Sequence, residues 1–216
     1  MTLETIIREA EVFVKSILGD DSSGHDWWHI DRVRNLALRI AREERANLFI
    51  CELAALLHDI ADGKLNESEA LGLKRVSDWL AKQGISDDIK SSILDIIQNM
   101  SFKAGLNKDK VLSLEGQIVQ DADRLDAIGA IGISRTMVYA GIKGNLIHVP
   151  GTKIRTEMTL EEYRQQESTA IAHFYEKLLL LKDLMNTATA KSLAEKRHGF
   201  MEAFLDEFYA EWSGIQ

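Results

Sequence analysis

Apolar residues recur at every third or fourth position along most of this chain, which is the spacing of helices with one buried face. Glycines and polar clusters divide the pattern into predicted helices at 3–18, 26–45, 48–61, 66–83, 86–100, from 114 to Gly141 and Gly144, 159–185 and 188–212. Between Gly144 and Met158 the pattern lapses, and Pro150-Gly151 predicts a turn in this stretch. The pattern therefore predicts an all-α fold.

The predicted helix at 48–61 is apolar on nearly every side, so we expect it to lie at the centre of the fold. It ends with the polar pair His58-Asp59, whose burial would cost free energy unless both side chains have partners. The helix at 26–45 carries His29 in its first turn, after Asp26, which can cap the free amides. Both helices therefore place ionisable side chains close to apolar core positions.

Imidazole and carboxylate groups near a core are donors that bind divalent metals such as Mn, Fe, Ni, Co and Zn. The candidates along the chain are His29, His58, Asp59 and Asp123, each beside apolar neighbours. Four such ligands leave two octahedral positions for water and a phosphate oxygen, which suits a hydrolase. The alternative for His58-Asp59 is a helix end at which the imidazole caps carbonyls and the carboxylate pairs with an arginine.

Length and composition fit one soluble domain over 1–216, with 45% hydrophobic and 28% charged residues. The formal net charge of −8 gives no general basic surface, which excludes the usual electrostatics of a nucleic-acid-binding protein. No stretch reaches the length of a membrane span, and the first residues lack the order of a secretory signal. With Cys51 alone, no intramolecular disulfide can form. We therefore expect a cytoplasmic protein without membrane or nucleic-acid partners.

Three segments together resemble the H…HD…D signature of the HD-domain phosphohydrolase superfamily: HIDRV at 29–33, AALLHDIAD at 54–62 and DADRLDA at 121–127. GHDWWH at 24–29, PGTK at 150–153, EMT at 157–159 and HFYEKL at 173–178 are similar to a bacterial single-domain subfamily, so the resemblance spans nearly the whole chain. It implies a single HD-type helical bundle with the metal site in its core at about 24–130, and C-terminal helices at about 159–213. The ligands that it implies are His29, His58, Asp59 and Asp123.

The resemblance also implies metal-dependent hydrolysis of a phosphate ester or anhydride. Some members of the subfamily convert (deoxy)nucleoside triphosphates to monophosphate and pyrophosphate, and this is the expected reaction. The alternatives are a nucleotide phosphomonoesterase of the 5'-nucleotidase type and a non-catalytic nucleotide-binding sensor. One divalent ion is expected, with Mn²⁺ first and Ni²⁺, Co²⁺, Fe²⁺, Zn²⁺ or Mg²⁺ as alternatives, because availability decides among them. A homodimer remains open.

A nucleotide substrate needs cations and polar groups around the metal. Asp62 lies one helical turn beyond His58 and could take a proton from the attacking water, or could simply be solvated at a helix end. The residues that could contact substrate lie near the proposed ligands or in the irregular stretch: Lys64, Arg124, His25, Lys153, Arg155 and Asp126. For the lysines and arginines, the alternative is an ordinary solvated surface charge.

Overall fold

The computed structural model describes residues 2–18, 26–62, 65–100, 111–155 and 168–215. Within these residues every regular element is a helix, which confirms the all-α class predicted from the sequence. The chain forms two compact units, Met1–Ala122 and Asp123–Gln216. That the whole chain acts as one domain stays a prediction.

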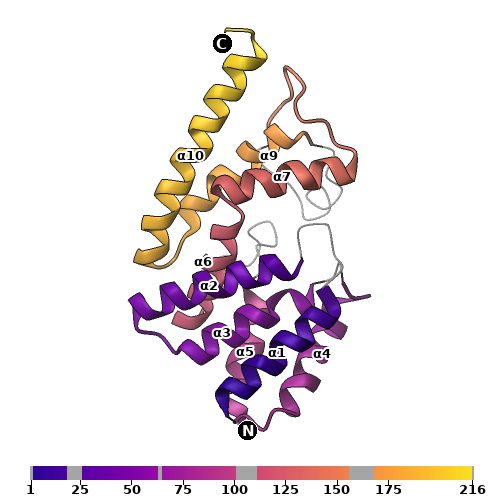
Figure 1. Ribbon diagram of the computed structural model, residues 1–216, viewed down its shortest axis with the longest axis vertical. Coiled ribbons are helices and arrows are strands. Elements are labelled where there is room, and N and C mark those ends of the chain that lie inside the picture. Colours follow the sequence, from indigo (N-terminus) through magenta and orange to yellow (C-terminus); the bar gives the residue numbers. More distant parts are fainter. Residues whose placement is uncertain (1, 19–25, 63–64, 101–110, 156–167, 216) are drawn as a thin grey trace. The chain divides into compact units, whose positions relative to one another are not determined.

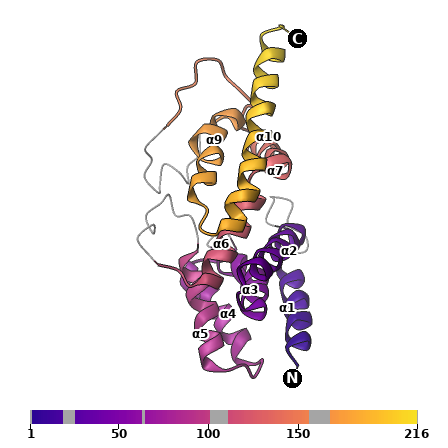
Figure 2. The same cartoon turned by 90° about the vertical axis from the view of Figure 1, so that its left-hand side faces the viewer.

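The first unit is built around α3 (Leu48–Leu57), which packs against α1 (Leu3–Leu18), α2 (Trp27–Glu44) and α5 (Asp87–Asn99). Figures 1 and 2 show α3 with these three helices around it. The side chains from Leu53 to Leu57 are fully buried, as expected for a helix without a polar face. The central position predicted for this helix is confirmed.

A 3-10 helix, η1 (His58–Ala61), follows α3 directly, so the helix at 48–61 is not α-helical to its end. The next helix, α4 (Glu69–Ala81), packs against η1 and α5. It starts later than the sequence indicates because Ser68 is the N-cap, its hydroxyl accepting from the amide of Leu71 at 3.3 Å. Residues Asn66 and Glu67 therefore precede the helix rather than open it.

The second unit contains the end of α6 (Leu114–Asp126), then α7 (Gly129–Lys143), α9 (Ala170–Glu176), η3 (Leu178–Leu184) and α10 (Ala188–Trp212). α7 packs against α10 and α9, and Figure 2 shows α9 alongside α10. Phe174 of α9 stacks on Phe204 of α10 with ring centroids 5.7 Å apart. The last helix has the bounds that the sequence predicts.

The prediction of one long helix from 114 to the glycines at 141 and 144 is wrong, because α6 ends at Asp126 and α7 begins at Gly129. Gly129 has a φ of 77°, a conformation that favours glycine. A Cβ on Gly132 would lie 2.2 Å from the carbonyl oxygen of Ala127, so this sharp turn requires a glycine there as well. Gly129 and Gly132 therefore mark a break that the pattern missed, whereas the predicted end is confirmed, because α7 ends at Lys143 with Gly144 as its C-cap.

The prediction of a continuous helix at 159–185 is also wrong in its described part. Ser168 and Thr169 are not helical, and the Thr169 hydroxyl caps α9 by accepting from the amide of Ala172 at 3.1 Å. At Lys177 the backbone leaves the helical region, with φ −143° and ψ −58°, and a 3-10 helix follows. The predicted start at Thr159 lies outside the described residues.

Candidate metal centre

Three of the predicted ligands meet in the first unit. His58 and Asp59 are the first two residues of η1, and His29 lies in the first turn of α2, where the Asp26 carboxylate accepts from the His29 amide at 2.8 Å. The exposed fractions are 1% for His29 and 8% each for His58 and Asp59. One potential ligand atom from each residue lies within 4.8 Å of the other two. The HD pair and His29 therefore form one buried group of metal-binding donors.

The Asp59 carboxylate lies between the two imidazoles. Its Oδ2 is 3.4 Å from Nε2 of His29, and its Oδ1 is 3.2 Å from Nε2 of His58. The two rings meet edge to face, with centroids 5.4 Å apart and an interplanar angle of 68°. Each oxygen of the carboxylate is thus directed at a ring nitrogen from a different element.

The tautomer of His58 follows from its other nitrogen. Nδ1 lies 2.8 Å from the carbonyl oxygen of Ala55, an acceptor, so Nδ1 carries the proton and donates it there. In the neutral ring Nε2 then has a lone pair facing a carboxylate oxygen, and two such acceptors repel unless a proton or a cation lies between them. A hydrogen bond from Nδ1 to a backbone carbonyl is also the usual support of a metal-binding histidine. The donor set therefore fits a divalent cation.

The fourth predicted ligand and the predicted catalytic residue are not part of this group of three. Asp123 is half-buried on α6 and is the first residue of the second unit, so it is not among the three residues brought together in the first unit. Asp62 follows η1 and is half-buried, and its amide donates to the carbonyl of Asp59 at 3.0 Å. His25 and Lys64 lie outside the described residues.

Three other predicted substrate residues, Arg124, Asp126 and Arg155, have partners within the second unit. The fourth, Lys153, is exposed. Arg124 donates from Nη1 to the carbonyl oxygen of Leu184. Asp126 is 1% exposed and pairs with Arg135 at 2.6 Å. Its carboxylate thus already has a cationic partner within the fold.

Arg155 binds Glu176 of α9 through two guanidinium nitrogens, each 2.8 Å from a carboxylate oxygen, and its backbone amide donates to the same side chain at 3.2 Å. The Ser168 hydroxyl donates to Glu176 at 2.9 Å. Burial alone would raise the pKa of this carboxyl, but the hydrogen bonds and the charge of Arg155 outweigh burial and hold its pKa below the usual value. The sequence predicted Arg155 as a substrate residue and did not single out Glu176 as its partner.

We expect Arg155→Met to lower the free energy of unfolding by about 2 kcal/mol. The usual cost of breaking a buried pair is reduced here because the Arg155 side chain is 31% exposed, whereas Glu176 is 3% exposed and loses its cation. Urea unfolding at pH 7 measures this. Because the folded pKa of Glu176 is depressed, its contribution is present above the unfolded pKa and disappears as pH falls through the folded pKa.

The matched control for this prediction is Lys153→Met, which removes an exposed cation from the same stretch. Unchanged stability of Arg155→Met, together with a raised KM for a triphosphate, would make Arg155 a substrate residue instead.

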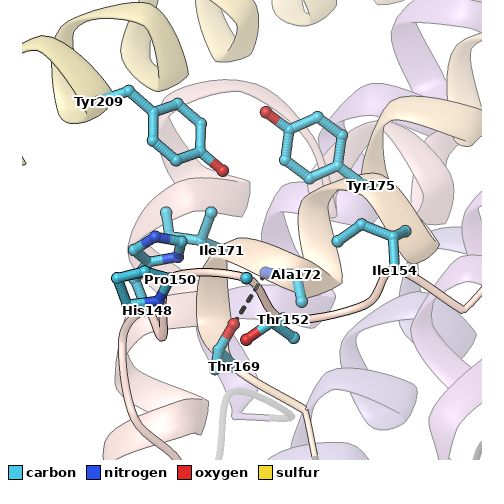
Figure 3. Close-up of a pocket in the computed structure, with 10 residues that line it drawn as sticks. His148, Pro150, Thr152, Ile154, Thr169, Ile171, Ala172, Tyr175 and Tyr209 are labelled. Atoms are coloured by element: carbon cyan, nitrogen blue, oxygen red, sulfur yellow. Dashed lines mark hydrogen bonds between the residues drawn. The ribbon is translucent and has the colours of Figure 1, made fainter.

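The second unit also contains a cavity of about 400 Å³ between residues 148–154, α9 and α10. Figure 3 shows the Tyr175 and Tyr209 hydroxyls directed toward one another, and the His148 ring packs edge to face against Tyr209 with centroids 5.5 Å apart. Burial and a hydrogen bond with Tyr209 raise the pKa of Tyr175 to about 12, so this phenol is neutral near pH 7. The described residues that line the cavity include no lysine, arginine, aspartate or glutamate, so they give a phosphate no permanently charged side chain to bind.

One residue near the metal group was missed by sequence reasoning. Asn66 was predicted to open the helix at 66–83, but its amide nitrogen donates to the carbonyl oxygens of Ile60 and Asp62, at the end of η1. The signal available in the sequence was Ser68, a better N-cap two residues later.

No helix in the described ranges is long and apolar enough to cross a membrane.

The chain is similar to a known family and to several solved structures. The HD domain family model matches residues 27–128, a stretch that contains His29, His58, Asp59 and Asp123. A crystal structure from Lactobacillus plantarum has 45% identity and a TM-score of 0.87, with 98% of each chain covered. An HD-superfamily hydrolase from Bacillus thuringiensis has 46% identity and a TM-score of 0.79, covering 98% of this chain and 99% of that one.

The crystal structure of Bacillus subtilis YpgQ in complex with ADP has 39% identity and a TM-score of 0.79, covering 98% of this chain and 97% of that one. These relatives match nearly the full length of the sequence, beyond the segment of the family model. The chain belongs to the HD-domain phosphohydrolase superfamily.

Proposed function

We propose that this protein is a metal-dependent phosphohydrolase that converts (deoxy)nucleoside triphosphates to monophosphate and pyrophosphate. The observation that carries the proposal is the buried group of His29, His58 and Asp59, in which a carboxylate faces two imidazole nitrogens. Neutral imidazole and carboxylate donors in a buried group suit a divalent transition metal. Mn²⁺ is the ion that we expect.

Asp123 is the proposed fourth ligand. Its support is the sequence resemblance and its place inside the stretch matched by the HD domain model. When bound, the metal supplies Lewis-acid stabilisation of phosphoryl oxygens and favours deprotonation of water. The protein's own contribution is to hold these donors, to supply a base and to bind the phosphates.

The nucleotide substrate class is supported by the ADP complex of the relative YpgQ. Lys64 and Arg124 are the cations that we propose for the phosphates, followed by Lys153. Within the second unit, the guanidinium of Arg124 donates to the carbonyl oxygen of Leu184. We propose His25 as a further substrate contact. Arg155 and Asp126 rank lower, because their observed ion pairs already give them structural roles.

In the proposed reaction a water oxygen bonds to the α-phosphorus while the bond from that phosphorus to the oxygen bridging to the β-phosphorus breaks. The Asp62 carboxylate accepts a proton from the attacking water. The bridging oxygen leaves with pyrophosphate, and the nucleoside monophosphate remains. Lys64 and Arg124 stabilise the charge on the phosphate oxygens.

The test is a product analysis on chelator-treated protein. We expect no hydrolysis of deoxynucleoside triphosphates without metal, and release of pyrophosphate and monophosphate after Mn²⁺ is added. Free phosphate from nucleoside monophosphates would point to the phosphomonoesterase alternative, and tight nucleotide binding without turnover to the sensor. Undiminished hydrolysis after chelation would contradict the proposal.

A further inference from the structure

The Asn66 side chain, which lies outside η1, hydrogen-bonds to the end of this 3-10 helix, whose first two residues are His58 and Asp59. Nδ2 of Asn66 donates to the carbonyl oxygen of Ile60 at 2.8 Å and to that of Asp62 at 2.9 Å. The carbonyl of Ile60 lies at the end of η1, where carbonyls have no partner within the helix and need an outside donor, whereas the carbonyl of Asp62 also accepts from the amide of Leu65 at 3.0 Å. Asn66 uses both hydrogens of its amide nitrogen for this purpose.

These two carbonyls belong to residues at or next to the proposed ligand and the proposed base. The carbonyl of Ile60 follows Asp59 by one residue, and the second carbonyl belongs to Asp62, the proposed base. The amide of Asp62 also donates to the carbonyl of Asp59 at 3.0 Å. The Asn66 side chain therefore links Ile60, the residue after the proposed ligand Asp59, to Asp62, the proposed base.

A glycine on α4, Gly72, allows this helix to pack closely against the end of η1. Gly72 is buried, and a Cβ at this position would lie 2.8 Å from Cα of Ala61 and 2.9 Å from its carbonyl oxygen. It would also lie 2.6 Å from Nδ2 of Asn66. The first two contacts are with backbone atoms, which cannot rotate away, so any side chain at 72 must displace η1 or α4.

We propose that Asn66 and Gly72 are positioning residues that hold η1 so that His58 and Asp59 face His29 in a geometry competent for metal binding. The inference rests on the proposed metal-dependent function. Its physical basis is that the three donors converge to within 4.8 Å from two separate elements, so movement of η1 relative to α2 spoils the donor set directly. Outer residues that orient ligands typically contribute to metal affinity without touching the ion.

The test is calorimetric titration of Mn²⁺ into metal-free wild type and Asn66→Asp. Aspartate has the same shape but no N–H donors, so it loses both hydrogen bonds and faces two carbonyl oxygens. We expect the affinity for Mn²⁺ to fall roughly 10- to 100-fold, the usual range for outer residues of a metal site. The added negative charge would by itself strengthen cation binding, so weaker binding reports the lost positioning.

Two further variants keep the test decisive if Asn66→Asp folds poorly. Asn66→Ser retains one donor and is expected to give a smaller loss than Asn66→Asp, and Gly72→Ala is expected to weaken Mn²⁺ binding with Asn66 intact. The matched control is Asn99→Asp, which makes the same charge change and loses an amide hydrogen bond to Asp95 on α5. We expect its Mn²⁺ affinity to equal that of wild type.

The failure of this inference is distinguishable from the failure of the proposed function. If wild type binds Mn²⁺ and folded Asn66→Asp and Gly72→Ala bind it equally well, the positioning role is overturned while the metal site stands. If wild type itself binds no divalent metal, the proposed function is overturned and the positioning role with it.

Discussion

Replacing Asp59 with alanine is expected to abolish triphosphate hydrolysis, leaving the level seen in chelated wild type. Its carboxylate faces both imidazoles, at 3.4 Å and 3.2 Å, so its loss removes a proposed ligand and the link between the two histidines. We expect a fall at least as large as the roughly 10²- to 10³-fold that follows removal of one charge-stabilising donor from an active site. Initial rates of pyrophosphate release measure it.

The matched control is Asp78→Ala. Asp78 is an exposed carboxylate on α4 that pairs with Lys74, so its loss should leave the rate unchanged. Circular dichroism would establish that both variants keep their helical content. Full activity of a folded Asp59→Ala protein would show that the group of His29, His58 and Asp59 has no role in the reaction.

Replacing Asp62 with asparagine is expected to lower kcat by roughly 10²- to 10⁴-fold, the usual contribution of a general base. The amide has nearly the same shape as the carboxylate but cannot accept the proton of the attacking water. The backbone bonds of residue 62 to Asp59, Leu65 and Asn66 do not depend on its side chain, so η1 should keep its structure.

A role in proton transfer and a role in metal binding give different results for this variant. We expect the Mn²⁺ affinity of Asp62→Asn to equal that of wild type, and the acidic limb of its pH–rate profile to change. A weakened Mn²⁺ affinity would make Asp62 a ligand. An unchanged kcat at every pH would leave it as a solvated residue at the end of η1.

The sequence was sufficient to predict where the metal-binding donors of the first unit lie. A helix that is apolar on all sides has to be central, so polar residues at its end need partners, and the structure places His29 beside His58 and Asp59. The all-α class followed from the same periodicity. The all-α class and the need of His58-Asp59 for partners depend on burial, which the order of apolar and polar residues expresses directly, whereas His29 was assigned to the same ion mainly by the resemblance to the HD signature.

The order of apolar and polar residues does not show where two backbone segments come close together. The break between α6 and α7 depends on Gly129 and Gly132, and the position of η1 on Gly72, because their missing Cβ atoms allow another segment to come near. In the sequence these residues are indistinguishable from helix-tolerated glycines, whereas Gly141 has no atom within 4 Å of its Cβ position. The pattern therefore found the end of α7, where Gly144 is the C-cap with a φ of 72°, but missed the earlier break at Gly129 and Gly132.

The roles of charged side chains were also poorly specified by the sequence. Arg155 and Asp126 were predicted to contact substrate, but the structure pairs them with Glu176 and Arg135. Such partners are 21 and 9 residues away along the chain, beyond the reach of local patterns. A cation near a predicted site is therefore a weak indicator of substrate binding until its ion pairs are known.

The central claim is tested most directly by a crystal structure of the protein with Mn²⁺, using an anomalous difference map at a wavelength where manganese scatters anomalously. We predict one strong peak, bound by Nε2 of His29, Nε2 of His58, a carboxylate oxygen of Asp59 and one of Asp123. A map with no peak at His29, His58 and Asp59, from crystals of protein shown to be active with Mn²⁺, would contradict it.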